Sequence, residues 1–166
     1  EYWHTLTSEL NRQKNLINEL LIAGRLESGK MKLDAVPMDL LPILHESVRA
    51  VKSIARMRNI TIELKVDFEL CTIFGDTGGL SQVFINLINN AVKFSPEGST
   101  VDVVATQSGA EREARISITD HGLGIPPEAV PHLFERFYRA KNVTVAEIPG
   151  TGIGLYIVKS IVDELG

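Results

Sequence analysis

Three glycines at alternate positions, Gly150, Gly152 and Gly154, stand directly before the last apolar segment of the chain. Glycine permits tight turns and lets the backbone come close to a ligand. The helix expected to follow offers unpaired N–H groups and the positive end of its dipole at its start. The run therefore predicts a phosphate-binding loop. A second glycine pair, Gly122 and Gly124, lies upstream and predicts a second part of the same site.

Composition limits the kinds of protein this chain can be. The 166 residues, 44% of them hydrophobic, suffice for one ordered domain with an appended element. A net charge of −4 argues against non-specific binding of nucleic acid. A single cysteine, Cys71, rules out an intramolecular disulfide and fits a reduced, cytoplasmic setting. No apolar stretch is long enough to span a bilayer, which is compatible with a membrane anchor elsewhere in a longer parent protein.

The first 30 residues predict one long helix over 3–28 that ends at Gly29 as a C-cap. A heptad seam runs along it, and such a seam needs a partner helix from the same or another chain. The alternative is a surface helix packed on its own domain. The seam positions are Leu6, Leu10, Gln13, Ile17, Leu20 and Gly24.

The remaining chain alternates strand and helix patterns and has no internal repeat. The pattern predicts an α+β fold with antiparallel strands and helices on one face of the sheet. Most prolines and little periodicity occur over 121–150. Strands are expected at 33–39, 60–66, 71–74, 101–106 and 114–119, and helices at 40–58, 80–94 and 151–165.

Two commoner phosphate loops do not fit. Residues 24–31 nearly match a P-loop, but Met31 replaces the Ser or Thr that would hold Mg²⁺, and the segment ends a helix instead of following a strand. The run over 150–154 reads G-x-G-x-G and not the G-x-G-x-x-G of a dinucleotide fold.

Three polar side chains share one face of the helix expected at 80–94. Asn86, Asn90 and Lys93 are spaced by four and three residues. Two amides and an ammonium can hold a hydrated Mg²⁺ and reach phosphate oxygens. The alternative interpretation is a solvent-exposed polar face.

Two further segments complete the pattern. Asp120 follows a predicted strand and precedes the Gly122–Gly124 pair, so its carboxylate can accept a hydrogen bond from an adenine amino group. Residues 133–139 are aromatic and basic, although a short helix that pins a loop to the core would have the same composition.

Together these segments resemble the histidine-kinase branch of the GHKL ATPases. Residues 86–94 resemble its N box, 120–125 its first glycine box, 134–137 its F box, and 150–154 its second glycine box. The resemblance implies a Bergerat fold, a two-layer α/β sandwich with a mixed, mostly antiparallel sheet. Residues 26–30 resemble the end of the second helix of the dimerisation and histidine-phosphotransfer hairpin. We therefore expect that helix at 1–30 and the catalytic domain at 31–166, with an ATP lid over 126–149.

The resemblance also implies a Mg²⁺-ATP site. Asp120 would bind the adenine amino group with a water near Thr151, and Asn90 would bind the metal. Arg139 is a candidate phosphate contact in the lid, and Phe94 would lie near the sugar or base. The expected nucleotide-binding residues are Asn86, Asn90, Lys93, Phe94, Asp120, Gly122, Gly124, Ile125, Arg139, Gly150, Thr151, Gly152, Ile153, Gly154 and Leu155.

One position favours phosphoryl transfer over hydrolysis. The gyrase, MutL and chaperone branches carry a glutamate one turn before the metal-binding asparagine, and that carboxylate activates water. Here the residue is Asn86, which is no base at neutral pH. The nucleophile would then be a histidine, but none of His4, His45, His121 and His132 has the expected setting.

We therefore expect a chain that lacks the first hairpin helix and the last two strands. It would bind ATP without completing autophosphorylation. The full-length kinase would dimerise through the hairpin and pass its phosphoryl group to a response-regulator receiver domain. Two alternatives remain open: a degenerate kinase domain used for dimerisation or docking, and an anti-sigma-type protein serine kinase, which lacks the hairpin helix.

Overall fold

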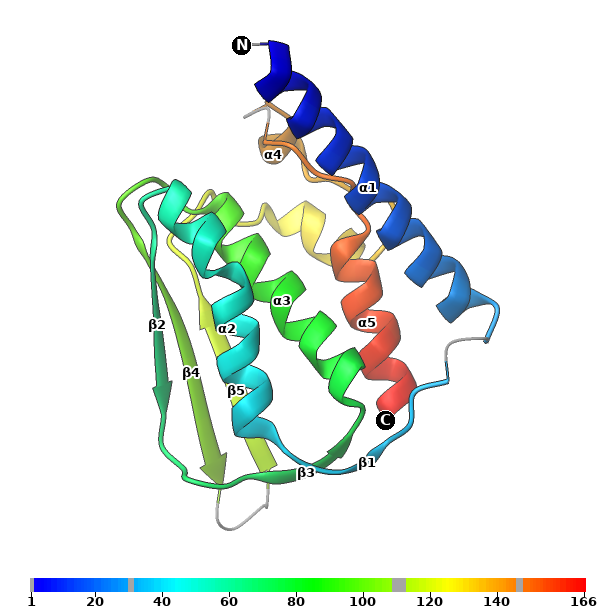
Figure 1. Ribbon diagram of the computed structural model, residues 1–166, viewed down its shortest axis with the longest axis vertical. Coiled ribbons are helices and arrows are strands. Elements are labelled where there is room, and N and C mark those ends of the chain that lie inside the picture. Colours follow the sequence, from blue (N-terminus) through cyan, green and yellow to red (C-terminus); the bar gives the residue numbers. More distant parts are fainter. Residues whose placement is uncertain (1, 30–31, 109–112, 146–147) are drawn as a thin grey trace.

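The computed structural model describes residues 2–29, 32–108, 113–145 and 148–166. The expected domain boundary at residues 30 and 31, and lid residues 146 and 147, lie outside them. In chain order (Figure 1) the elements are α1 Tyr2–Glu27, β1 Val36–Asp39, α2 Leu40–Met57, β2 Thr61–Val66, β3 Thr72–Gly75, α3 Thr77–Phe94, β4 Thr100–Ser108, β5 Glu113–Thr119, the 3-10 helix Pro127–His132, α4 Lys141–Val145 and α5 Gly154–Leu165.

A three-stranded mixed sheet forms one layer and helices form the other. Strand β4 lies between β2, to which it runs parallel, and β5, to which it runs antiparallel. A separate antiparallel pair joins β1 to β3. Helices α2 and α3 cover one face of the sheet, and α5 lies beside α3 (Figure 1). The predicted α+β class, with helices on one face, is confirmed.

Helix α3 is the centre of the core because it contacts α2, α5, β4 and β5. Its Ile88 and Val92 are fully buried, as are Ile157 and Ile161 of α5. Alternate residues of β4 point into the same core, as the two-residue period of a strand requires. Each such aliphatic side chain contributes about 1.5–3 kcal/mol on burial. The packing fixes α3 firmly, and α3 carries the polar face that the sequence singles out.

Helix α1 is confirmed, and Gly29 takes the left-handed conformation of a C-cap, with φ +62°. The helix packs on α5 through a face that contains the fully buried Ala23. Most of the predicted heptad seam points elsewhere, since Leu10 is 64% and Ile17 is 56% exposed. Within the described residues α1 is thus packed on its own domain, and most of the seam lies on its open side. No helix among the described residues has the length and hydropathy needed to cross a membrane.

Several boundaries differ from the predictions. Helix α3 begins at Thr77, three residues before its predicted start. The carboxylate of Asp76 caps it there by accepting a hydrogen bond from the Gly79 N–H at 2.7 Å. Helix α5 begins at Gly154 and not at Thr151, because Gly152 takes a φ of +73° that no helix allows. Strand β1 is shorter than predicted. The segment 121–150 contains the 3-10 helix and α4, which its weak periodicity does not reveal.

Replacing Asp76 by alanine should lower the free energy of unfolding by about 1–2 kcal/mol, the range for loss of an N-cap. The second oxygen of Asp76 also accepts the Asp34 N–H at 3.1 Å, so the change frees two backbone donors. Urea denaturation measures the loss. Asp34→Ala is the control, because it keeps that N–H and should stay within about 0.5 kcal/mol of the wild type. Equal losses in both variants would contradict the capping role.

Candidate functional site

The polar face of α3 meets the start of α5. Asn86 donates from Nδ2 to the carbonyl of Gly154 at 3.2 Å, and its Oδ1 accepts from Nε2 of Gln82 at 3.1 Å. Both ends of this amide are therefore occupied by protein groups. Asn90, one turn further, and Lys93 are half-buried on the same face. The sequence prediction that these three residues share a face holds in the structure.

The run over 150–154 passes directly against this face. The Nζ atom of Lys93 lies close to where a Cβ atom on Gly150 would stand, so a side chain there would displace the end of the Lys93 side chain. Gly152 packs as closely on the backbone of Phe137 and Tyr138, and its carbonyl accepts the Phe137 N–H at 2.9 Å. The glycines thus allow one loop to contact α3 on one side and the F-box segment on the other.

Lys93 sits in an unusual electrostatic environment. Burial, and then the neighbouring guanidinium of Arg139, lower the pKa of Lys93 from its ordinary 10.5. Arg58 lowers this pKa further, while the Glu19 carboxylate opposes the shift. The Lys93 ammonium also lies 4.9 Å from the centre of the Phe94 ring. A partly buried ammonium beside two guanidinium groups is a site that attracts an anion.

Residues 120–122 pack against the end of α3. A Cβ on Gly122 would collide with the carbonyl oxygen of Phe94, so the close approach again requires glycine. Asp120 accepts the Gly122 N–H on Oδ1 at 2.9 Å, which fixes the turn and leaves its exposed carboxylate at the surface. A cavity of about 310 Å³ opens at the end of α3, and its walls are Arg58, Lys93, Phe94, Ser95, Pro96, His121, Gly122, Leu123 and Ile148.

The segment expected to be a lid is tied to both glycine segments. Arg139 donates from Nη2 to the carbonyl of Ile148, and Asn142 donates to the carbonyl of Gly124 at 3.0 Å. Phe137 has a positive φ of 65°, rare for a bulky residue, and it occurs where its N–H reaches Gly152. These bonds connect residues 137–142 of the expected lid to Gly124, Ile148 and Gly152.

The remaining expected nucleotide-binding residues differ from one another in burial and in their contacts. Ile153 is fully buried and belongs to the core, whereas Ile125 is 55% exposed. Ile153 is also the N-cap residue of α5 and makes no capping side-chain bond, so the first turn of the helix keeps its N–H groups uncapped by a side chain. Leu155 is half-buried in that turn. Thr151 is engaged by a residue that sequence reasoning missed, Glu19 of α1.

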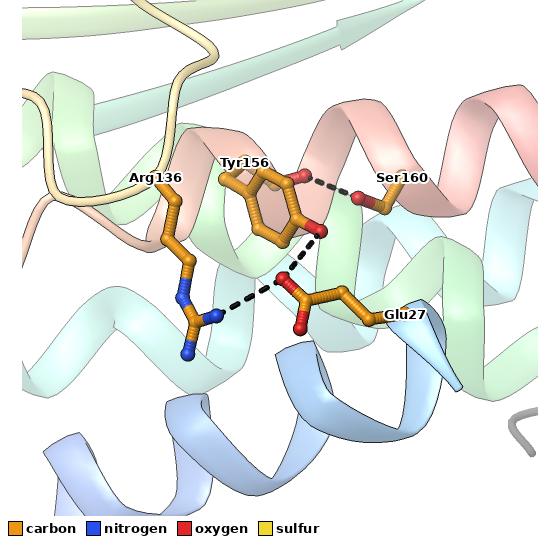
Figure 2. A network of polar contacts seen from close by, with 4 residues as sticks. All are labelled: Glu27, Arg136, Tyr156 and Ser160. Carbon is orange, nitrogen blue, oxygen red and sulfur yellow. Dashed lines mark hydrogen bonds and ion pairs between the residues drawn. The ribbon is translucent and has the colours of Figure 1, made fainter. Parts of the chain in front are cut away.

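Helix α1 reaches the site through two glutamates. Glu19 accepts the hydroxyl of Thr151 at 2.5 Å. Figure 2 shows the second contact, where Glu27 accepts from Arg136 at 3.0 Å and from the Tyr156 hydroxyl at 3.2 Å. Both glutamates lie on a strongly polar helix, where nothing local distinguishes them from solvated charges.

Arg58 is a third residue that the sequence did not reveal. It lies just past the end of α2 and donates to the carbonyl oxygens of Lys93 at 2.6 Å and Ser95 at 3.4 Å. These carbonyls stand at the end of α3, where the helix leaves them without partners of its own. Arg58 thus fixes the last turn of α3, which carries Lys93 and Phe94.

Comparison with known proteins gives a consistent family. The family described as "Histidine kinase-, DNA gyrase B-, and HSP90-like ATPase" matches residues 75–166. Drug sensory protein A of Synechocystis sp. is 37% identical over 98% of this chain, which spans 25% of that protein. The histidine-protein kinase/phosphatase MprB of Mycobacterium avium is 34% identical over 93% of this chain, which spans 28% of that protein. The chain thus spans about a quarter of these relatives.

Solved structures agree. The mycobacterial sensor histidine kinase MprB superposes with a TM-score of 0.66 at 34% identity, over 80% of this chain and 81% of that one. Full-length ShkA, solved in complex with AMPPNP, superposes with a TM-score of 0.79 at 29% identity. That match covers 98% of this chain and 33% of ShkA, so it includes α1.

Replacement by alanine should affect stability strongly at Gly152 and hardly at all at Gly154. Gly152→Ala should lower the free energy of unfolding by at least about 1–2 kcal/mol, since a Cβ is strained at φ +73°, and it would also stand 2.7 Å from the Phe137 carbonyl carbon. Gly154→Ala should cost little, because its Cβ would meet nothing closer than Asn86 Cγ at 4.0 Å. Thermal unfolding of both variants measures this. Equal effects would show that the loop does not pack as described.

Lys93→Met should raise the free energy of unfolding at neutral pH by about 1 kcal/mol, because it removes a partly buried charge that the Glu19 carboxylate compensates only in part. The folded wild type releases the Lys93 proton at lower pH than the unfolded chain does. Wild-type stability therefore rises with pH between the lowered pKa and 10.5, and the advantage of the variant should shrink there. Denaturation across pH tests this, with Lys52→Met on the exposed side of α2 as the unchanged control. A less stable Lys93→Met protein would contradict it.

Proposed function

From the premise that this chain belongs to the histidine kinase-, DNA gyrase B- and HSP90-like ATPase family, we propose that it is the Mg²⁺-ATP-binding kinase domain of a sensor histidine kinase. Its site is formed by α3, the two glycine segments and the lid. In the full-length protein it transfers the γ-phosphoryl group of ATP to a histidine outside residues 1–166. A response-regulator receiver domain then takes that group.

One observation carries the proposal: two glycine segments far apart in sequence converge on the second half of α3. Gly150 contacts Lys93, Gly122 contacts the Phe94 carbonyl, and Gly154 accepts a hydrogen bond from Asn86. A side chain at Gly122 would collide with the backbone of Phe94, and one at Gly150 would displace the end of the Lys93 side chain. Lys93, Arg139 and Arg58 form a cationic cluster here. A close approach of backbone beside such a cluster is the arrangement that binds a nucleotide polyphosphate.

The α3 residues fit a magnesium ion held partly by nucleotide and water. Mg²⁺ prefers oxygen ligands and keeps several waters, so it needs only one or two protein groups. Asn90 is half-buried beside Asn86 and Lys93 and would supply an amide oxygen. When bound, the ion neutralises phosphate charge. Lys93 and Arg139 would bind phosphate oxygens, and Asp120 would accept the adenine amino group.

The site favours transfer to another group over attack by water. Asn86 holds the position where a hydrolytic branch needs a carboxylate, and both atoms of its amide are already bound by Gln82 and Gly154. It therefore acts as a brace between α3 and α5. The exposed seam on α1, including Leu6, Leu10 and Ile17, is a fitting surface for dimerisation through the hairpin. We place the whole kinase domain in the cytoplasm.

Calorimetric titration with AMPPNP in the presence and absence of Mg²⁺ tests the site. Asp120→Asn should weaken binding by about tenfold or more, because it presents an NH₂ or a neutral oxygen to the adenine amino group. Asn90→Ala should abolish most of the Mg²⁺ dependence and leave the metal-free affinity nearly unchanged.

Matched controls use the same substitutions elsewhere. Asp163→Asn lies on the exposed side of α5 and Asn18→Ala on the exposed side of α1. Both should bind AMPPNP like the wild type. Undiminished affinity of both site variants would overturn the assignment, and no binding by the wild type would favour a degenerate docking domain.

A further inference from the structure

Glu19 of α1 engages a residue of the second glycine segment. The Thr151 hydroxyl donates its only proton to Oε2 of Glu19 at 2.5 Å and accepts the Ile153 N–H at 3.2 Å. The only proton of this hydroxyl is therefore already engaged within the chain. Any ligand or water that needs its proton must first displace Glu19.

Other contacts hold α1 in the place from which Glu19 reaches Thr151. Two turns later, Glu27 binds both Arg136 of the F-box segment and Tyr156 of α5 (Figure 2). Between the two glutamates, Ala23 is fully buried against the domain. The polar contacts of Glu19 and Glu27 thus lie on either side of the apolar contact made by Ala23. Together they attach the helix to the second glycine segment, to Arg136 and to α5.

The position also has an electrostatic consequence. The Glu19 carboxylate is near enough to Lys93 to raise the pKa of that ammonium against the effects of burial, Arg139 and Arg58. Glu19 thus supplies negative charge at the cationic cluster where the proposed function places phosphate. A phosphate group and this carboxylate would compete for the same favourable potential and would repel each other.

We propose that Glu19 is a residue of the nucleotide site supplied by α1, and that it opposes nucleotide by holding the Thr151 hydroxyl. The inference rests on the proposed function and adds its regulation. Nucleotide binding releases Glu19 from Thr151 and weakens the docking of α1. Because coupling between two binding events is reciprocal, release of α1 equally strengthens nucleotide binding. A signal that moves this helix thereby sets the affinity of the domain for ATP.

The test compares AMPPNP affinity, with Mg²⁺, of the wild-type chain and Glu19→Gln. Glutamine keeps the shape but removes the charge and the charge-assisted hydrogen bond, so binding should tighten by about three- to tenfold. Glu164→Gln on the exposed side of α5 makes the same change in net charge and should bind like the wild type. Equal or weaker binding by Glu19→Gln than by the wild type would overturn the inference.

Hydrogen exchange of the wild-type chain tests the reciprocal effect. Saturating AMPPNP should speed the exchange of amides over 16–26, because α1 docks less firmly. Unchanged or slower exchange there would overturn the inference even if the affinities differed. If neither the wild type nor Glu19→Gln binds nucleotide, the proposed function fails as well, whereas equal binding by both overturns only the role of Glu19.

Discussion

The close approach of glycine backbone to α3 is the constraint on which the site depends. A side chain at Gly122 would strike the Phe94 carbonyl, and one at Gly150 would strike the Lys93 ammonium. These contacts bring two loops to one helix end. Gly152 packs in the same way against the backbone of Phe137 and Tyr138. Because α3 itself is buried between the sheet, α2 and α5, the loops have a rigid surface to pack on.

The same arrangement holds positive charges close together in a partly buried place, which is unfavourable until an anionic ligand binds there. Lys93 is partly desolvated beside Arg139 and Arg58, which lowers its pKa. Stability alone would favour an apolar side chain there, and sites that bind charged ligands commonly retain such a cost. Glu19 offsets part of it in the ligand-free chain. The helix that carries the predicted dimer seam is thus also connected to the nucleotide site.

The sequence anticipated what local chemistry determines. Hydrophobic periodicity located the long helices, Gly29 marked the end of α1, and the order of the four motifs identified a family that the comparisons confirm. The roles of the individual site residues stay predictions. The parallel pairing of β2 with β4 was not anticipated, because it joins strands far apart in the chain. Arg58, Glu19 and Glu27 were missed for a related reason: each acts through a distant partner, and no nearby residue marks it.

The most direct test of the account is a map of backbone amide shifts as the chain is titrated with AMPPNP and Mg²⁺. If the end of α3 organises the site, the largest changes will fall within 86–94, 120–125 and 150–155, and the β1–β3 pair will hardly respond. Changes centred on β1 and β3, or a map without response in α3 at saturating nucleotide, would contradict the account.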